Sequence, residues 1–156
     1  MRIPLISVGL LVLGAAVLHG QDTTSAKKPE LKWGPAPPVF PKGATMAVVS
    51  GDPAKPEMFT IQLAMPDGYR IAPHFHPTDE SVEILRGTFL VGMGDTFDES
   101  KTKTMKKGDK MPVAANMHHY GTAKGATVLS VTAMGPFVLT YVNPADDPQK
   151  PPANHQ

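Results

Sequence analysis

Histidine and glutamate side chains in the middle of the chain have the types and spacing of a metal site. His74 and His76 stand two residues apart in a strand-like run, so both imidazoles are expected on the same face of a strand. Glu80 follows with the same parity, and a second pair, His118 and His119, comes later in the chain. Imidazole and carboxylate ligands suit Fe²⁺, Mn²⁺, Ni²⁺, Cu²⁺ or Zn²⁺. These residues predict a site for one divalent transition metal ion, and the ligand types leave its identity open.

The elements that must position these residues are short β-strands. Apolar or alternating runs are separated by turn residues such as Pro66-Asp67-Gly68 and Lys107-Gly108-Asp109. The 17 prolines and 14 glycines argue against a helical protein, because both residue types interrupt helices. Many short strands at this spacing predict an all-β protein, either an antiparallel barrel or a sandwich. The expected strands are 45–50, 58–65, 69–76, 81–85, 88–94, 101–105, 118–123, 126–134 and 137–142.

The stretch from Gly68 to Gly87 resembles the first motif of the cupin superfamily. Gly68 is followed by five residues, then by His74-x-His76, three residues, Glu80, six residues and Gly87. The resemblance implies that Gly68 turns the chain into a strand and that Gly87 lies in a tight turn before the next strand. It also implies that His74, His76 and Glu80 face the interior of a barrel.

A second stretch, from Gly108 to Ala123, resembles the second cupin motif less closely. That motif runs Gly, five residues, Pro-x-Gly-x-x-His, three residues and Asn, and here Ala114, Asn116 and Ala123 replace its Pro, Gly and Asn. Asn tolerates a positive φ better than most residues, so Asn116 can serve in the turn. The final histidine of the motif is present as His119.

The resemblance also decides between the two adjacent histidines. Neighbours on a strand point to opposite faces, so only one of His118 and His119 is expected to reach a metal. The motif spacing selects His119 and leaves His118 at the rim. The resemblance therefore implies that residues 44–142 form a cupin barrel, an antiparallel double-stranded β-helix of the jelly-roll type. Its metal ligands would be His74, His76, Glu80 and His119.

The resemblance implies an enzyme more readily than a structural protein. Four protein ligands leave about two positions open on an octahedral ion, which suits a small molecule that chelates through two oxygens. A dioxygenase-like oxidation, or an isomerase or lyase step, is expected. Glu80 is also a candidate base, and Tyr120, next to His119, is a candidate to line or gate the cavity. The alternatives are a non-catalytic module that binds a small molecule through the metal, and a purely structural metal site.

Composition and charge exclude several other classes. The 15 Lys and Arg residues are balanced by 14 Asp and Glu residues, without the basic stripe of a nucleic-acid binder. The lysines between Lys101 and Lys110 are expected in a solvated hairpin. The absence of Cys excludes disulfides, thiolate metal ligands and Cys nucleophiles. The numerous Met residues favour gap-filling in a barrel, with Cu(I) handling as the alternative.

The first twenty residues have the pattern of a secretory signal. A basic start is followed by an apolar run from Ile3 to Leu18, shorter than the roughly 20 residues that span a bilayer comfortably. Small and polar residues then place a cut after Gly20. We therefore expect a signal peptide at residues 1–20, export to the periplasm or medium, and no stable membrane insertion after cleavage. An uncleaved membrane anchor is the alternative.

Proline-rich segments flank the expected barrel. Residues 21–43 carry prolines that cannot pair in a central strand and favour the polyproline conformation. Trp33, Val39 and Phe40 are nevertheless expected to pack across the domain. Residues 143–156 form a second proline-rich tail. The partner expected from the site is a small molecule, and the resemblance is compatible with a homodimer formed through strand edges.

Overall fold

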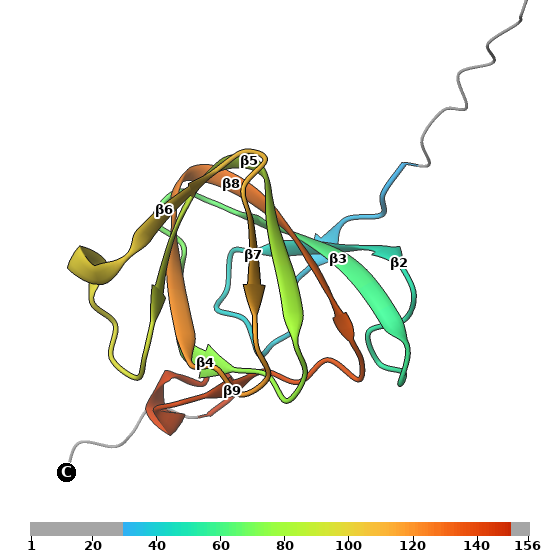
Figure 1. Ribbon diagram of the computed structural model, residues 1–156. Helices are drawn as coiled ribbons and strands as arrows, with labels where there is room; N and C mark the ends of the chain where they lie inside the picture. Colours follow the sequence, from blue (N-terminus) through green and yellow to red (C-terminus); the bar gives the residue numbers. More distant parts are fainter. Residues whose placement is uncertain (1–29, 151–156) are drawn as a thin grey trace, which may run out of the picture.

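The computed structural model describes residues 30–150, which fold into one antiparallel β-barrel (Figure 1). The predicted signal peptide at residues 1–20 lies outside the described residues. No helix among residues 30–150 is long and apolar enough to cross a membrane. The elements are β1 (Gly34–Pro35), β2 (Thr45–Ser50), β3 (Met58–Met65), β4 (Arg70–Phe75), β5 (Glu80–Met93), η1 (Glu99–Lys101), β6 (Lys103–Lys106), β7 (Lys110–Val113), β8 (His119–Met134), β9 (Thr140–Tyr141) and η2 (Pro144–Asp146).

Two long strands, β5 and β8, hold the barrel together. They pair antiparallel along their whole length, from Glu80 opposite Ala133 to Met93 opposite His119. The first part of β5 and the last part of β8 join β7, β3 and β2, whereas the remaining parts join β6, β4 and β9. The predicted all-β jelly-roll fold is confirmed. The sequence predicted each long strand as two short ones, which was wrong.

A β-bulge in β5 explains that error. Buried side chains are at even positions up to Ile84 and at the odd positions Phe89 and Val91 after it. The register shifts on both sides of Arg86, and an extra residue in a strand moves the following side chains to the other face. Gly87 therefore lies within the bulge at φ +79°, not in a turn between strands. A Cβ there would collide with the backbone of the facing strand at Ala126.

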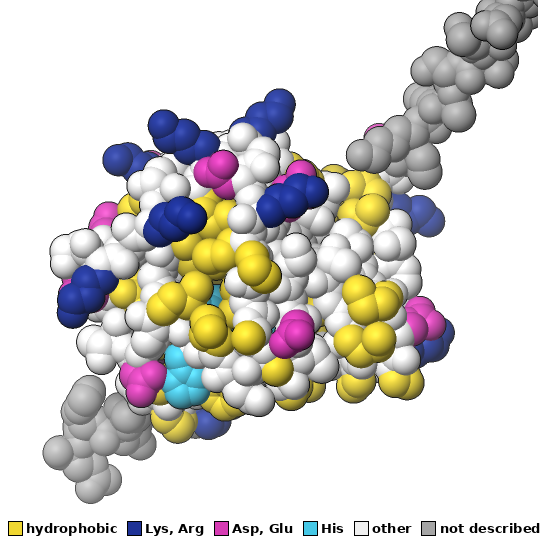
Figure 2. Space-filling view, viewed as in Figure 1, with side chains coloured by type: hydrophobic (Ala, Val, Ile, Leu, Met, Phe, Trp, Pro, Cys, Tyr) yellow, Lys and Arg dark blue, Asp and Glu magenta, His cyan; other side chains and the backbone are white. Residues whose placement is uncertain are grey.

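The lysine-rich stretch does not form the predicted hairpin. β6 and β7 each pair with β5 and not with one another. Gly108, between them, donates its N–H to the Ile84 carbonyl, so the stretch runs along β5 as one interrupted strand. Its lysines are exposed, as predicted. Figure 2 shows Lys and Arg side chains spread over the upper part of this face, above a hydrophobic middle.

Residues 30–43, here called the strap, close one side of the barrel. Its two-residue strand β1 pairs only with β2, so its prolines stay at the edge of the sheet as expected. Phe40 is buried and Val39 is partly buried against the core, which confirms their predicted packing. Trp33, by contrast, is 44% exposed, so its predicted packing is wrong.

Two tyrosine hydroxyls fasten the strap to the barrel. Tyr69 donates to the Pro41 carbonyl at 2.6 Å, and Tyr141 donates to the Val39 carbonyl at 2.8 Å. Burial raises the pKa of Tyr69 to about 12, so its phenol keeps its proton well above the ordinary value of 10.0. Because the strap carries Phe40 into the interior, these hydrogen bonds help to set the shape of the cavity.

Removal of the Tyr69 hydroxyl should loosen the strap without unfolding the barrel. We expect Tyr69→Phe to lower the free energy of unfolding by about 0.5–1.5 kcal/mol at neutral pH. The folded pKa lies above the unfolded one, so the stability that Tyr69 contributes is complete below pH 10.0 and is lost as pH rises toward 12. In urea titrations from pH 10 to 12, the free energy of unfolding should fall less with rising pH for Tyr69→Phe than for the wild type. An equal fall in the free energy of unfolding in both proteins would show that Tyr69 does not cause it.

Candidate metal centre

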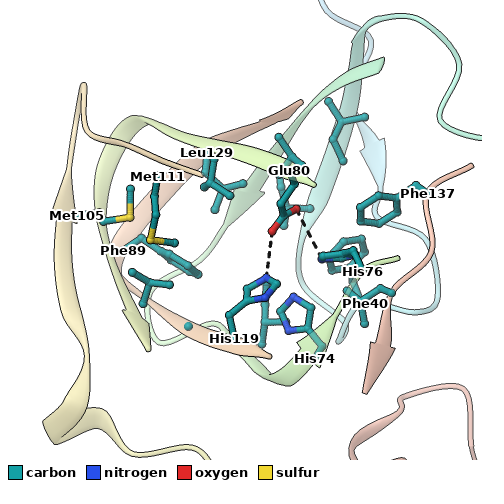
Figure 3. Close-up of a pocket in the computed structure, with 18 residues that line it drawn as sticks. Phe40, His74, His76, Glu80, Phe89, Met105, Met111, His119, Leu129 and Phe137 are labelled. Carbon is teal, nitrogen blue, oxygen red and sulfur yellow. Dashed lines mark ion pairs between the residues drawn. The ribbon is translucent and has the colours of Figure 1, made fainter. Parts of the chain in front are cut away.

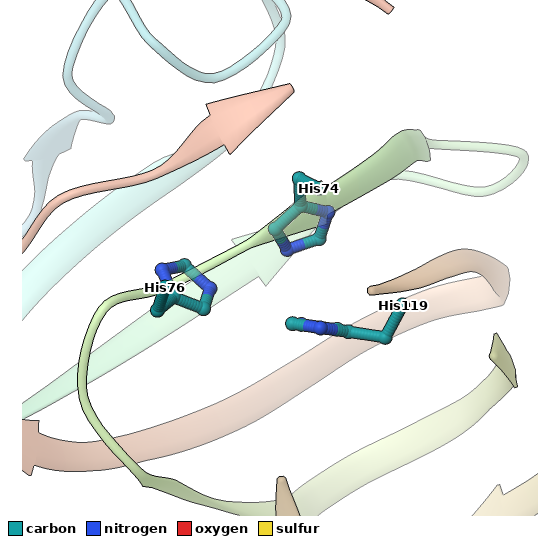
Figure 4. A group of neighbouring side chains, drawn as sticks. All are labelled: His74, His76 and His119. Carbon is teal, nitrogen blue, oxygen red and sulfur yellow. The ribbon is translucent and has the colours of Figure 1, made fainter. Parts of the chain in front are cut away.

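The structure brings His74, His76, Glu80 and His119 together inside the barrel. His74 lies in β4, His76 directly follows it, Glu80 begins β5 and His119 begins β8. His74 and His119 are direct cross-strand partners, so two stretches distant in sequence meet at one point (Figure 4). All four side chains are buried, with 5–6% of each residue exposed.

The three imidazoles lie almost at the spacing of metal ligands. The ring centroids of His119 lie 4.1 Å from His74 and 5.4 Å from His76, and the latter two are 5.1 Å apart. One ring nitrogen from each lies within 4.8 Å of the other two. Nitrogen ligands at about 2.1 Å from an ion are at most about 4.2 Å apart. This buried group could therefore hold a metal ion after only a small adjustment.

Backbone carbonyls orient each of the three rings. A carbonyl oxygen can only accept, so the Nδ1 atom beside it carries a proton, and in the neutral ring the free lone pair is then on Nε2. This arrangement is typical of metal-binding histidines, whose second nitrogen is held by an acceptor. These acceptors could not be predicted from the sequence, because every residue has a carbonyl. Nδ1 of His74 donates to the Ala72 carbonyl at 2.8 Å, and Nδ1 of His76 donates to the Val138 carbonyl at 2.7 Å. Nδ1 of His119 donates to the Met117 carbonyl at 3.0 Å.

Burial keeps the two histidines of the first motif neutral. It lowers the pKa of His74 well below the ordinary value, and the neighbouring rings of His119 and His76 lower it further. Burial also lowers the pKa of His76, although the Glu80 carboxylate acts in the opposite direction. Neutral imidazole is the form that binds metals, so both rings are ready to act as ligands near neutral pH.

Glu80 completes a set of donors that calls for a cation. Its carboxylate oxygens lie 3.1 Å from Nε2 of His119 and 3.6 Å from Nε2 of His76 (Figure 3). Within residues 30–150, Glu80 forms no ion pair with a Lys or Arg side chain. A buried carboxylate facing nitrogen lone pairs is costly unless a cation neutralises it. The donor set therefore fits a divalent metal ion.

The turn of the second motif fixes His119 relative to the first motif. Asn116 has φ +61°, which confirms that it takes the glycine position of the turn. Its N–H donates to the His76 carbonyl at 2.7 Å. The N–H of the preceding residue, Ala115, donates a hydrogen bond to the Asp79 carboxylate, also at 2.7 Å. These bonds explain how the turn delivers His119 to the metal centre although Ala114 replaces the motif proline.

His118 lies outside the cluster, at the rim. Its Nδ1 lies 2.6 Å from the Asp95 carboxylate, and its ring stacks on Phe75 with centroids 4.9 Å apart. It is only partly buried, unlike His119. The strand geometry thus separates the two neighbours as expected, and His119 is the one that faces His74.

The structure does not bring Tyr120 to the site. As the strand neighbour of His119, it points to the other side of the barrel wall, where it is 1% exposed. Its ring packs over Gly92 and against Phe97, 4.9 Å away, and its hydroxyl donates to the Asp98 carbonyl at 3.0 Å. Tyr120 therefore supports the wall and the following loop, and it has no place in lining or gating the cavity.

The metal centre opens into a cavity that the sequence only partly revealed. The cavity measures about 50 Å³, room for a few water molecules. Met105 and Met111 line the cavity. Phe137 lines it as well, and its ring lies 5.0 Å from the His76 ring. Phe137 follows the Gly135-Pro136 break, so strand alternation could not have located it.

Solved structures show which fold this is. An RmlC-like cupin from Shewanella frigidimarina matches with a TM-score of 0.50 and 17% identity over 59% of this chain and 76% of that chain. The polyketide cyclase RemF from Streptomyces resistomycificus matches with a TM-score of 0.57 and 18% identity over 69% of this chain and 76% of that one. No protein-family model and no curated protein matches the sequence.

A larger enzyme contains the same barrel. A mutant salicylate 1,2-dioxygenase from Pseudoaminobacter salicylatoxidans, in complex with gentisate, matches with a TM-score of 0.52 and 15% identity. The match covers 63% of this chain and 29% of the dioxygenase. The protein therefore has the cupin fold, which confirms at the level of the fold the resemblance seen in its two sequence motifs.

Adjacent histidines provide a matched test of the metal centre. We expect the wild type to bind about one divalent ion per chain and His119→Ala to lose more than about 100-fold in affinity, because removal of an outer partner alone costs up to that much. His118→Ala should bind as the wild type does. Titration of the metal-free protein with Zn²⁺ or Co²⁺, followed by elemental analysis, measures both. Equal losses in the two variants would show that the cluster is not the binding site.

Proposed function

We propose that this protein is an exported metal-dependent enzyme acting on a small oxygen-chelating molecule. His74, His76, Glu80 and His119 would hold one divalent ion, whether Fe, Mn, Ni, Cu or Zn. The expected reaction is a dioxygenase-like oxidation, or an isomerase or lyase step. The observation that carries the proposal is the buried group of three histidines, each oriented by an Nδ1–carbonyl hydrogen bond, beside the buried Glu80 carboxylate.

The residues of the site have distinct parts in this proposal. When bound, the metal supplies Lewis-acid or electron-transfer chemistry to the chelated molecule. The three histidines position that molecule, since their rings are fixed by the backbone and cannot turn away. Glu80 is the one carboxylate among the described residues that line the cavity, so it is the candidate to take a proton from the substrate. The hydrophobic walls exclude water around the bound molecule.

The similarity of the fold to enzyme structures supports an enzymatic function, but it does not specify the reaction. The similar structures include a polyketide cyclase and a dioxygenase, two different activities on one fold. Folds of this kind host many chemistries, so the reaction depends on the site and not on the barrel. The proposal therefore rests on the donor set of this chain, and the reaction class has to come from turnover measurements.

A non-catalytic binding module is the second candidate. Apart from the four residues of the metal centre, the cavity lining among the described residues offers no acid or base. Such a lining can hold a small molecule on the metal without converting it. This candidate differs from the enzyme in one measurable respect, which is that bound ligand is recovered unchanged.

Turnover and its dependence on Glu80 separate the two candidates. With the metal-loaded wild type and a panel of diols and phenols, we expect O₂ uptake or product formation that His76→Ala abolishes. Glu80→Gln should reduce turnover by about 10²–10⁴-fold through loss of the proton acceptor. His118→Ala should leave turnover unchanged. An oxygen electrode and product chromatography measure these effects, and stoichiometric binding without turnover would favour the module.

Export forms a separate part of the proposal, resting on the apolar run at residues 1–20. In a bacterial host that secretes proteins, we expect the mature chain to begin at Gln21, after a cut following Gly20. Amino-terminal sequencing of the periplasmic or secreted protein checks this. A chain that keeps its first residues and sediments with membranes would indicate the uncleaved anchor instead.

A further inference from the structure

The cavity beside the metal centre is apolar on every side except at the metal ligands. Eighteen residues line it, and only the three histidines and Glu80 have polar side chains. Among the described lining residues there is no Lys, Arg, Asn, Gln, Ser or Thr. A ligand in this cavity therefore finds hydrogen-bonding or ionic partners only at the metal centre.

Two hydrophobic surfaces flank the metal ligands. Figure 3 shows one on the left, made by Met105, Met111, Phe89 and Leu129, which we call the methionine side. On the opposite side, the rings of Phe40 and Phe137 stack with centroids 6.2 Å apart and an angle of 13° between their planes (Figure 3). The metal centre thus lies between a deformable surface and a flat aromatic one.

We infer that the molecule bound here carries no charge and no hydroxyl group beyond the oxygens that chelate the metal, and that the rest of it is a compact hydrocarbon body. This inference rests on the proposed function, because it places the chelating oxygens on the metal. A carboxylate, phosphate or sugar hydroxyl buried on the methionine side would lose its water without gaining a partner. An apolar group in the same place gains about fourfold in affinity for each buried methylene.

The dimensions of the cavity limit the hydrocarbon body. At about 50 Å³, the cavity takes only a small group as it stands. Met105 and Met111 can make further room, since methionine side chains are unbranched and adapt to irregular shapes. Met111 is also only partly buried, so its side chain borders the outside. A single ring with small substituents is therefore the upper limit, and it needs the room that the methionine side chains can make.

The stacked rings favour a planar ligand. Phe137 lies 5.0 Å from the His76 ring and also contacts Phe59 edge to face at 5.6 Å, so its orientation is held from two sides. Phe40 comes from the strap, which the Tyr69 and Tyr141 hydroxyls fasten. A flat, conjugated chelating group can lie against such a surface with favourable aromatic contact. Phenolic or enolic chelators are therefore expected over flexible hydroxy acids.

A matched pair of catechols tests this inference. 4-Methylcatechol and 3,4-dihydroxybenzoate share the same two chelating oxygens, and differ in having a methyl or a carboxylate on the far side of the ring. The protein is first loaded with redox-inactive Zn²⁺ and its metal content is measured. Calorimetric titration without oxygen should then give an affinity at least tenfold higher for 4-methylcatechol. Each affinity is compared with that of free Zn²⁺ for the same compound, which removes differences in chelation strength.

The outcomes distinguish this inference from the proposed function. Equal or tighter binding of 3,4-dihydroxybenzoate to zinc-loaded protein overturns the inference and leaves the metal centre intact. Failure to bind Zn²⁺ and each of the other four proposed ions overturns the proposed function and the inference together. Zinc-loaded protein that binds neither catechol also overturns the inference, since a planar apolar chelator is the ligand that the cavity should accept.

A charge placed on the methionine side should reverse the preference. Met111→Lys introduces a cation that can pair with the carboxylate of 3,4-dihydroxybenzoate, so we expect that ligand to gain at least tenfold relative to 4-methylcatechol. Met111→Leu is the control of similar volume and should keep the wild-type preference. Circular dichroism shows whether each variant is folded. If Met111→Lys does not fold, the wild-type titrations with the two catechols decide the question by themselves.

Discussion

The metal centre depends on the fixing of three imidazole rings by the backbone. Each ring donates a hydrogen bond from Nδ1 to a carbonyl oxygen, and the Nε2 atoms of His76 and His119 lie 3.6 and 3.1 Å from the Glu80 carboxylate. The carbonyls belong to β4, to the turn before β8 and to the segment after β8, so the site exists only when these parts of the chain are in place. Metal binding would therefore be coupled to closure of the barrel, because the ion would hold together the same strands that orient its ligands.

The metal centre is polar, whereas the rest of the cavity lining among the described residues is apolar. The bulge at Gly87 changes the inward parity of β5, so Glu80 and Phe89 both point inward although one position is even and the other odd. One strand thereby supplies the carboxylate of the metal centre and part of the hydrophobic wall. The contrast between a charged point and apolar surroundings strengthens electrostatic interactions at the metal centre, and it also restricts what else can be bound there.

The fold class predicted from the sequence is confirmed, whereas the four-residue ligand set stays a prediction. Strand geometry placed His74 and His76 on one face, because they lie two residues apart. Glu80 and His119 were added by the resemblance to the two cupin motifs. Strands β2 and β3 were predicted with their observed bounds, and the buried positions of β3 alternate without interruption. The glycine-like role of Asn116 followed from its tolerance of positive φ, which is a property of the residue itself.

The tertiary structure alone decided which side chains share the cavity with the metal. Phe137 reaches it from beyond a Gly-Pro break and Phe40 reaches it from the strap, and neither has a sequence pattern that points there. Tyr120 lies across the wall from the cavity although it directly follows His119. The physical reason is that residue types and spacing carry information about faces of one strand. Bulges, strap packing and backbone acceptors arise only when distant segments meet, and side-chain identity does not encode them locally.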